Sequence, residues 1–254
     1  TGSSKTSSQR YVFNTGVEVS TKFSKLTPNT KSKLFDVNGI RHIIQPSINY
    51  AFIPRPNRVP DELDQFDYEL TSPRLLPIEF PENNAIDNID SQNVLRLGLR
   101  NRLQTKRSNG LQDVADWDLF TDWRIDPNSG QSKFADLFSD AIIRPRSWLS
   151  LNSGLRYDLD DSLWRTINHG FTISPKSNRW NIQGGQYYYL AHPSTSKSDR
   201  TDVFYSGLGY RLNENWSFST RQYYDSKLGE LAQHDYIIHR DMSSWTFFID
   251  LSFR

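Results

Sequence analysis

The sequence of 254 residues contains no cysteine, which excludes disulfide bonds and thiolate metal sites. It also lacks any apolar run near the roughly 18 residues of a transmembrane helix, so a membrane crossing would have to be made by strands. Neither sign of charge dominates, since 30 basic residues stand against 29 acidic ones. This balance gives no electrostatic case for nucleic-acid binding. Phosphate-binding glycine loops and the common hydrolase motifs are missing too. We therefore expect no enzyme, cofactor, metal site or nucleic-acid partner.

Apolar residues are scarce, whereas aromatic residues are abundant. Hydrophobic residues make up 36% of the chain and aromatic residues 13%. A membrane β-barrel has this combination, because its interior is polar and its outside needs only a thin apolar coat.

One hairpin unit recurs four times in the carboxyl-terminal part of the chain. Each unit opens with a tryptophan after a short polar turn and reaches another aromatic eight or nine residues later. The pairs are Trp148 and Tyr157, Trp180 and Tyr188, Trp216 and Tyr224, and Trp245 and Phe253. Between them apolar and polar residues alternate, which indicates strands with one apolar face. Only Trp148 is out of phase with its unit, which a bulge or a turn position would explain.

The spacing of these aromatics fits the thickness of a bilayer. Eight residues at about 3.3 Å each, tilted by about 40°, rise roughly 20 Å. The apolar band of an outer-membrane barrel is about 25 Å tall and is rimmed by aromatic girdles. We predict that the girdles include Trp180, Trp216, Trp245, Tyr157, Tyr188 and Tyr224. A soluble antiparallel sheet with one wet face would show the same alternation.

Further strands are expected on both sides of these units. The predicted ranges are 11–23, 41–53, 93–105, 117–125, 139–144, 163–173, 202–212 and 233–240. A polar connection containing Pro28 separates the first two, and a Pro- and acid-rich external loop covers about 54–92. The predicted fold is all-β, an antiparallel up-and-down transmembrane barrel, here a partial barrel of roughly twelve strands that forms one segment over 1–254.

Charged residues alternate with the apolar ones on several strands and are predicted to face a lumen. They are Arg96, Arg100, Arg102, Asp118, Asp122, Arg124, Arg156 and Arg221. Such a row could guide a charged ligand or could be a salt-bridge network that only fills space. The five histidines are scattered, and only His234 with Asp235 resembles a base with its orienting carboxylate. A polar loop edge explains that pair more simply.

Connection lengths predict the orientation of the strands. The turns before the four tryptophans are short, whereas 192–200 and 226–232 are predicted to be longer loops on the outer side. With this alternation the last strand ends at the external face. We therefore expect a closing strand to be missing after Arg254. We interpret the chain, which opens Thr1-Gly2-Ser3-Ser4, as a fragment of a longer protein.

The chain contains several distinctive strand-and-turn motifs: RPRSWLSL at 144–151, LRYD at 155–158, YRLNENWS at 210–217, YIIHRDMSSW at 236–245 and RHIIQPSINY at 41–50 with DQFD at 64–67. Together these motifs resemble the barrel of the LPS-assembly outer-membrane protein, the LptD family. The resemblance covers nearly the whole chain from about residue 10 and places it in the carboxyl-terminal part of that barrel.

This resemblance implies a non-enzymatic translocon that assembles lipopolysaccharide (LPS) at the surface of a Gram-negative bacterium. The implied partners are LPS, outer-membrane lipid, a plug lipoprotein of the LptE type, and a periplasmic LPS bridge. The bridge docks on an amino-terminal jellyroll, which we expect to be absent from this chain. Strands of the lateral gate are expected outside the chain, so no gate residue is assigned. Some members carry a cysteine pair near the turn that 241–244 occupies here. The alternatives are a porin-like barrel, a rim hydrolase using His234 and Asp235, and a soluble carbohydrate-binding sheet.

Overall fold

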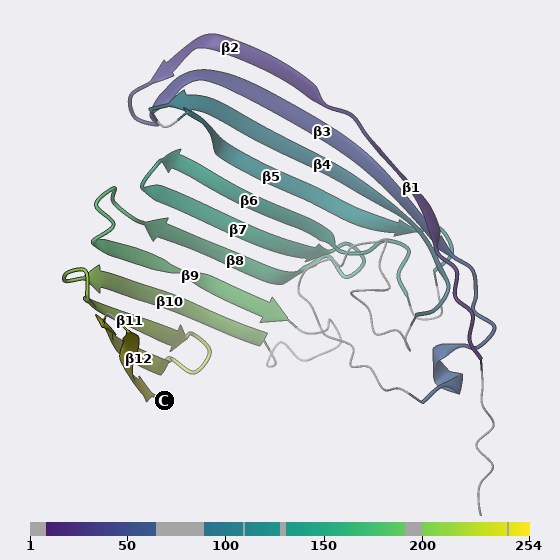
Figure 1. Cartoon of the computed structure of the whole chain (residues 1–254). Helices are drawn as coiled ribbons and strands as arrows, with labels where there is room; N and C mark the ends of the chain where they lie inside the picture. The colour runs from purple at the N-terminus through teal and green to yellow at the C-terminus, as the bar shows by residue number, and fades with distance from the viewer. Residues whose placement is uncertain (1–8, 65–88, 109, 128–130, 191–199, 243) are drawn as a thin grey trace, which may run out of the picture. The chain divides into compact units, whose positions relative to one another are not determined.

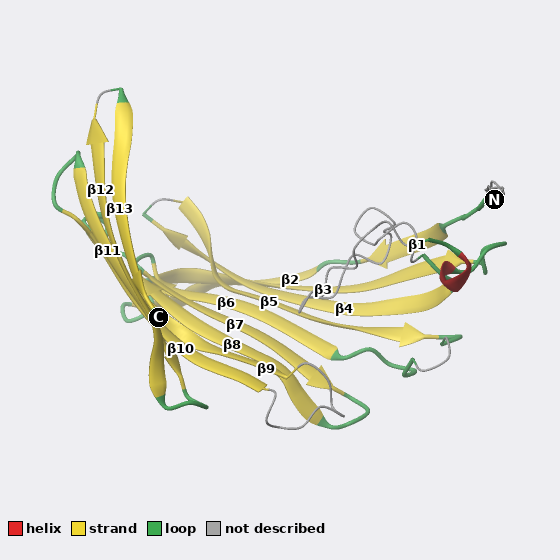
Figure 2. Cartoon of the chain, turned by 90° about the horizontal axis from the view of Figure 1, so that it is seen from below, coloured by secondary structure: helices red, strands yellow, loops and turns green. Residues whose placement is uncertain are grey.

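The computed structural model describes residues 9–64, 89–108, 110–127, 131–190, 200–242 and 244–254. Thirteen antiparallel strands form one sheet in this part of the chain (Figures 1 and 2). They are β1 (Thr15–Ser20), β2 (Phe23–Ser32), β3 (Val37–Ile53), β4 (Gln92–Arg107), β5 (Gly110–Arg124), β6 (Leu137–Arg146), β7 (Leu149–Asp158), β8 (Leu163–Ile173), β9 (Trp180–Leu190), β10 (Arg200–Arg211), β11 (Trp216–Asp225), β12 (Glu230–Met242) and β13 (Trp245–Phe253). The one helical element described is the 3-10 turn η1 (Pro60–Glu62). No helix in the described ranges has the length and apolarity to cross a membrane.

From β3 to β13 each strand pairs with the next one in the sequence. At the other end of the order, β1 and β2 both pair with β3, one along each half of it. Among the described strands β1 and β13 do not pair with each other, so the sheet is not closed. The predicted fold class, an antiparallel all-β sheet consistent with a partial barrel, is confirmed.

The tryptophan units correspond closely to observed strands. Trp180, Trp216 and Trp245 are the first residues of β9, β11 and β13. Trp148 lies in the two-residue turn between β6 and β7, which explains why it was out of phase. The strand predicted at 163–173 has the bounds of β8.

The sequence prediction was wrong between the first two strands, where it placed a polar connection. Residues of that stretch form β2, which pairs with β3 from Phe23 opposite Ile44 to Ser32 opposite Val37. Pro28 is accommodated because the register shifts between Thr27 and Lys31 and because β3 is the only described strand that β2 pairs with. This additional strand accounts for thirteen strands instead of roughly twelve.

The connection predicted at 226–232 is also shorter than expected. β11 ends at Asp225 and β12 begins at Glu230, so four residues turn the chain. Asp225 accepts hydrogen bonds from the backbone N–H groups of Lys227 and Leu228, and Gly229 takes a positive φ of 73° that favours glycine. Most of the other two predicted loops, 65–88 of the loop at 54–92 and 192–199 of the loop at 192–200, lies outside the described residues.

The contacts divide the chain into two compact units. Unit 1 comprises Thr1–Thr21, Pro46–Gly98 and Phe120–Asp136, and unit 2 comprises Lys22–Gln45, Leu99–Leu119 and Leu137–Arg254. Each has a small core: Ala51, Ile53, Ile89, Val94 and Ala135 in unit 1, and Val37, Ile43, Phe138 and Leu190 in unit 2. Many more large apolar side chains are exposed, among them Trp245, Phe247 and Phe253. Exposed apolar surface of this extent marks an interaction site.

Candidate functional site: the two sheet faces and a buried arginine

Strands β6–β13, all within unit 2, have one apolar face, defined here by the positions that share a side with Trp180. Trp180 lies opposite Tyr210, and Tyr210 lies opposite Phe218. All six predicted girdle aromatics lie on this apolar face. Trp180, Trp216 and Trp245 form a row where β9, β11 and β13 begin, and Tyr157, Tyr188 and Tyr224 lie toward the other strand ends.

Ring contacts reinforce both rows. Tyr157 packs edge-on against Trp164 with the ring centroids 5.0 Å apart. In the other row the guanidinium of Arg240 lies 4.8 Å from the ring centroid of Trp216, a cation–π contact. An edge-on ring pair and a cation–π contact are both favourable geometries for aromatic side chains.

Between the two rows the apolar face carries a shallow depression of about 750 Å³ across β6–β10. Its floor is made by small residues, and its walls by larger apolar side chains such as Leu151, Phe171 and Phe204. The floor residues are Ala141, Ser153, Gly184 and Ser206. Apolar side chains therefore dominate the surface between the rows.

The opposite side of β6–β13 is the polar face. It carries two of the predicted lumen residues. Arg156 stacks its guanidinium 5.2 Å from the ring centroid of Phe138 and covers this buried side chain. Arg221 lies directly across the ladder from Asp235. The alternation that separates them from the aromatic rows is the one predicted from the sequence.

In unit 1, Arg96 on β4 and Asp122 on β5 form a two-pronged ion pair. Arg96 donates from Nε to Oδ1 at 2.7 Å and from Nη2 to Oδ2 at 3.1 Å. The side chains are 19% and 10% exposed. Arg124 donates to the backbone carbonyl of Ser132 at 2.8 Å and forms no ion pair with a carboxylate among the residues that the structure describes. The strand charges that were predicted to meet do so here.

In unit 2, Arg100 on β4 pairs with Asp116 and Asp118 on β5. The distances are 2.9 and 2.5 Å to the two carboxylate oxygens of Asp116 and 3.6 Å to Asp118. Sequence analysis missed Asp116 because it started the strand at Trp117, although Asp116 has the phase of Asp118. Arg102 forms no ion pair with a carboxylate in the described ranges.

Replacing Asp122 with Asn should lower the free energy of unfolding by about 1–3 kcal/mol, because the half-buried guanidinium of Arg96 loses its charged partner. Asp118→Asn is the matched control, since Asp118 is 42% exposed and its pair should contribute less than about 1 kcal/mol. Urea unfolding in detergent micelles measures both. Equal effects of the two substitutions would contradict the interpretation that burial determines how much each ion pair contributes to stability.

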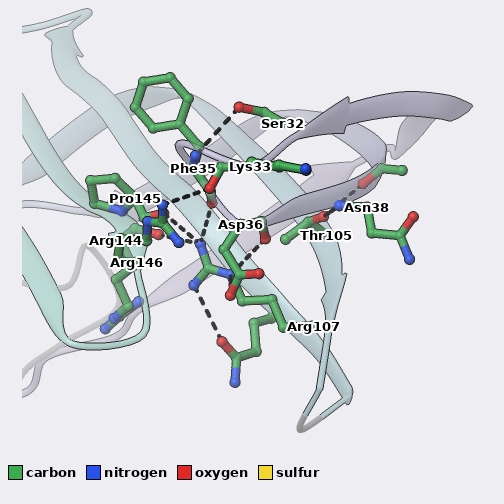
Figure 3. A network of polar contacts seen from close by, with 12 residues as sticks. Ser32, Lys33, Phe35, Asp36, Asn38, Thr105, Arg107, Arg144, Pro145 and Arg146 are labelled. Carbon is green, nitrogen blue, oxygen red and sulfur yellow. Dashed lines mark hydrogen bonds and ion pairs between the residues drawn. The ribbon is translucent and has the colours of Figure 1, made fainter. Parts of the chain in front are cut away.

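Arg107, at the end of β4, is the most deeply buried charged side chain of the described network, with 2% of the side chain exposed. It donates to the carbonyl oxygens of Phe35 and Asp36 at 3.1 and 3.2 Å. It also donates to the carbonyl oxygens of Arg144 and Pro145 at 2.8 and 3.0 Å (Figure 3). The guanidinium thus binds the connection between β2 and β3 and the last residues of β6.

Neighbouring contacts extend this arginine clamp, by which we mean Arg107 and the groups it binds. Arg107 also donates to Gln112 Oε1 at 3.3 Å, and Arg146 donates to the carbonyl of Lys33 at 2.6 Å. Thr105, which is buried, accepts from the backbone N–H of Asn38 and donates to the carbonyl of Gly39. Sequence analysis missed the clamp. The sequence nevertheless contained a sign of it, because Arg107 is a charged residue at a position that shares a face with the apolar residues Leu99 and Leu103.

The structure does not support the proposed His234–Asp235 dyad. The two residues are consecutive in β12, so His234 lies opposite Phe253 on the apolar face and Asp235 opposite Ser252 on the polar face. Asp235 accepts hydrogen bonds from Gln233 and Ser252. The hydrolase hypothesis therefore loses its only candidate pair. Within the described ranges there is also no group of three or more metal-ligating side chains.

The antiparallel meander with one apolar and one polar face is consistent with a partial β-barrel. Residues 2–126 match the family model described as LptD protein. This match supports an LptD-family protein, as the resemblance predicted, and it includes the motifs at 41–50 and 64–67. No curated protein matches the chain.

Proposed function

We propose that this chain is a segment of an outer-membrane β-barrel that assembles LPS at the surface of a Gram-negative bacterium. The family match supports this, because LptD proteins are outer-membrane proteins that transport LPS. The observation that carries the proposal is the register of β6–β13, which gathers the apolar side chains on one face between two aromatic rows.

In this proposal the apolar face contacts outer-membrane lipid. A bilayer core offers no hydrogen-bonding partners, so only a chain whose backbone groups pair internally can cross it. A sheet of paired strands meets this requirement everywhere except at its edges. The two rows that include Trp180 and Tyr188 would then lie at the two membrane–water interfaces.

The polar face would line the lumen. The residues we propose there are Arg96, Arg100, Arg102, Asp118, Asp122, Arg124, Arg156 and Arg221. Most of the first six are engaged in contacts between β4 and β5, so their first role in this proposal is to stiffen the wall of the lumen. A plug lipoprotein of the LptE type would occupy that lumen, and a periplasmic bridge would deliver LPS through a jellyroll domain. Residues 1–254 would form one barrel segment with an external loop at about 54–92.

Depletion of the protein in its source bacterium tests the function. LPS accessible to an antibody on intact cells should fall, while total LPS in lysed cells persists, because synthesis does not depend on the last transport step. A strain depleted of an unrelated porin is the control. Unchanged surface LPS would contradict the proposal, and slower uptake of small solutes with normal surface LPS would favour the porin-like alternative.

A further inference from the structure

The middle of the polar face of β8, β9 and β10 is free of charge, between Arg165 at the start of β8, which pairs with Asp158, and Arg211 at the end of β10, which lies opposite Ser217. This neutral patch consists of every second residue from Thr166 to Thr172 on β8, from Asn181 to Tyr189 on β9 and from Thr201 to Gly209 on β10. These positions hold hydroxyl, amide and tyrosine side chains together with glycines and Val203. Charged side chains lie on both flanks of this neutral patch on the same face. They include Asp140, Arg156 and Asp158 on β6 and β7, and Arg221, Asp225 and Asp235 on β11 and β12.

We propose that the neutral patch binds the saccharide portion of LPS by stacking sugar rings on tyrosine. This inference rests on the proposed function and adds the part of the substrate that unit 2 recognises. The argument starts from Tyr205, which is placed by two glycines on neighbouring strands.

Tyr205 lies across β9 and β8. A Cβ atom added to Gly185 would come within 2.7 Å of the Tyr205 hydroxyl oxygen and 2.8 Å of its Cζ, and one added to Gly170 would come within 2.6 Å of the hydroxyl. The ring therefore occupies the space that side chains would otherwise fill at both positions. One side of the ring covers backbone, and the residue is only half-buried, so part of the ring remains available to a ligand on the polar face.

Other aromatic and amide groups surround this ring. Tyr223 lies directly opposite Tyr205 on β11. On β9 the rings of Tyr187 and Tyr189 are nearly parallel, with an interplanar angle of 13° and centroids 6.5 Å apart. Asn168 lies opposite Tyr187, and amide groups of this kind donate and accept hydrogen bonds at once. The patch thus offers flat rings next to two-way hydrogen-bonding groups.

This chemistry matches a sugar better than the other parts of LPS. A tyrosine ring has a negatively polarised face, which attracts the positively polarised C–H groups on one side of a sugar ring. Sugar hydroxyls both donate and accept, as the amides do. The phosphates of LPS would prefer arginine, which the patch lacks, and acyl chains would prefer the opposite face.

The test is photo-crosslinking in cells that carry the full protein. A photoreactive amino acid replaces Asn168 in the patch, Arg102 on β4 or Phe204 on the apolar face, and crosslinks to LPS are quantified. The measurement is repeated in a strain whose LPS is truncated to lipid A with a minimal sugar. With truncated LPS we expect the yield at Asn168 to fall, while the yield at Phe204 stays the same.

Substitutions then test the role of the ring with normal LPS. Tyr205→Leu should lower the yield at Asn168 by about threefold to tenfold, the factor for one aromatic stacking contact, and Tyr205→Phe should retain it. Gly170→Ala should lower the yield as well, because the new methyl group displaces an unaltered Tyr205. Phe204→Leu, on the other face, is the control for general disturbance of β10.

The outcomes separate the two levels of the proposal. Crosslinks at Arg102 with none at Asn168, or a yield at Asn168 that truncation does not change, would overturn the saccharide site and leave LPS transport standing. No crosslink to LPS at any of the three positions would overturn the proposed function itself.

Discussion

Replacing Arg107 with alanine is expected to lower the free energy of unfolding by about 3 kcal/mol or more. The side chain donates to four backbone carbonyl oxygens, from Phe35, Asp36, Arg144 and Pro145. Alanine would leave these acceptors without a donor in a site where the native guanidinium is 2% exposed. A buried acceptor that loses its partner costs about 1–3 kcal/mol, and water entering the site would recover part of the sum.

Arg107→Lys separates charge from geometry. An ammonium keeps the charge but lacks the planar fork of donors, so it cannot bind both pairs of carbonyl groups at once. We expect a loss smaller than that of alanine but still measurable. Urea unfolding of the refolded protein in micelles, followed by tryptophan fluorescence, provides the comparison.

Arg100→Ala is the matched control for the clamp. Arg100 lies on the same strand and also forms ion pairs, but its side chain is 43% exposed, so its removal should cost less than about 1 kcal/mol. If Arg107→Ala and Arg100→Ala destabilised the protein equally, the clamp would not hold the connections together as its contacts indicate.

Strands β9, β11 and β13 could be predicted from the sequence because two local signals coincide there. A polar turn precedes Trp180, Trp216 and Trp245, and strict alternation follows each of them, so the start of the strand and its apolar face were both determined locally. The aromatic rows followed from the same phase. Long alternating segments of this kind need no knowledge of their neighbours.

Features that depend on distant partners could not be predicted. β2 has a proline and no clear alternation, and only its pairing with β3 makes it a strand. Arg107 finds its carbonyl partners 71 and 72 residues before it and 37 and 38 residues after it in the chain. Tyr205 is positioned by Gly185 and Gly170 on two other strands.

The hypothesis of a His234–Asp235 dyad failed for a reason that the sequence already contained. Neighbouring residues of a strand point to opposite faces, so a base and its carboxylate cannot be consecutive there. The range 233–240 had been predicted as a strand on the same evidence. Consistent use of the period of two would have excluded the pair.

Two neighbouring isoleucines on β12 allow a direct test of which face contacts lipid. Ile238 lies between Phe218 and Ile249 on the apolar face, and Ile237 lies between Ser219 and Asp250 on the polar face. Each is replaced by arginine. The substitutions share residue type, strand and depth along the strand, so only the face differs.

Ile238→Arg should destabilise the protein in a bilayer by about 2–4 kcal/mol, because a guanidinium within the hydrocarbon loses its hydration without gaining a partner. Ile237→Arg should cost less than about 1 kcal/mol, since the new charge faces water and lies opposite Asp250. Folding into lipid vesicles, followed over a urea series by tryptophan fluorescence, measures both. In a soluble sheet the order would vanish or reverse, because both faces would meet water. A larger loss of stability at Ile237 would therefore indicate that the polar face contacts the membrane. The aromatic rows and the proposed saccharide patch would then lie on the wrong faces of the sheet for their proposed roles.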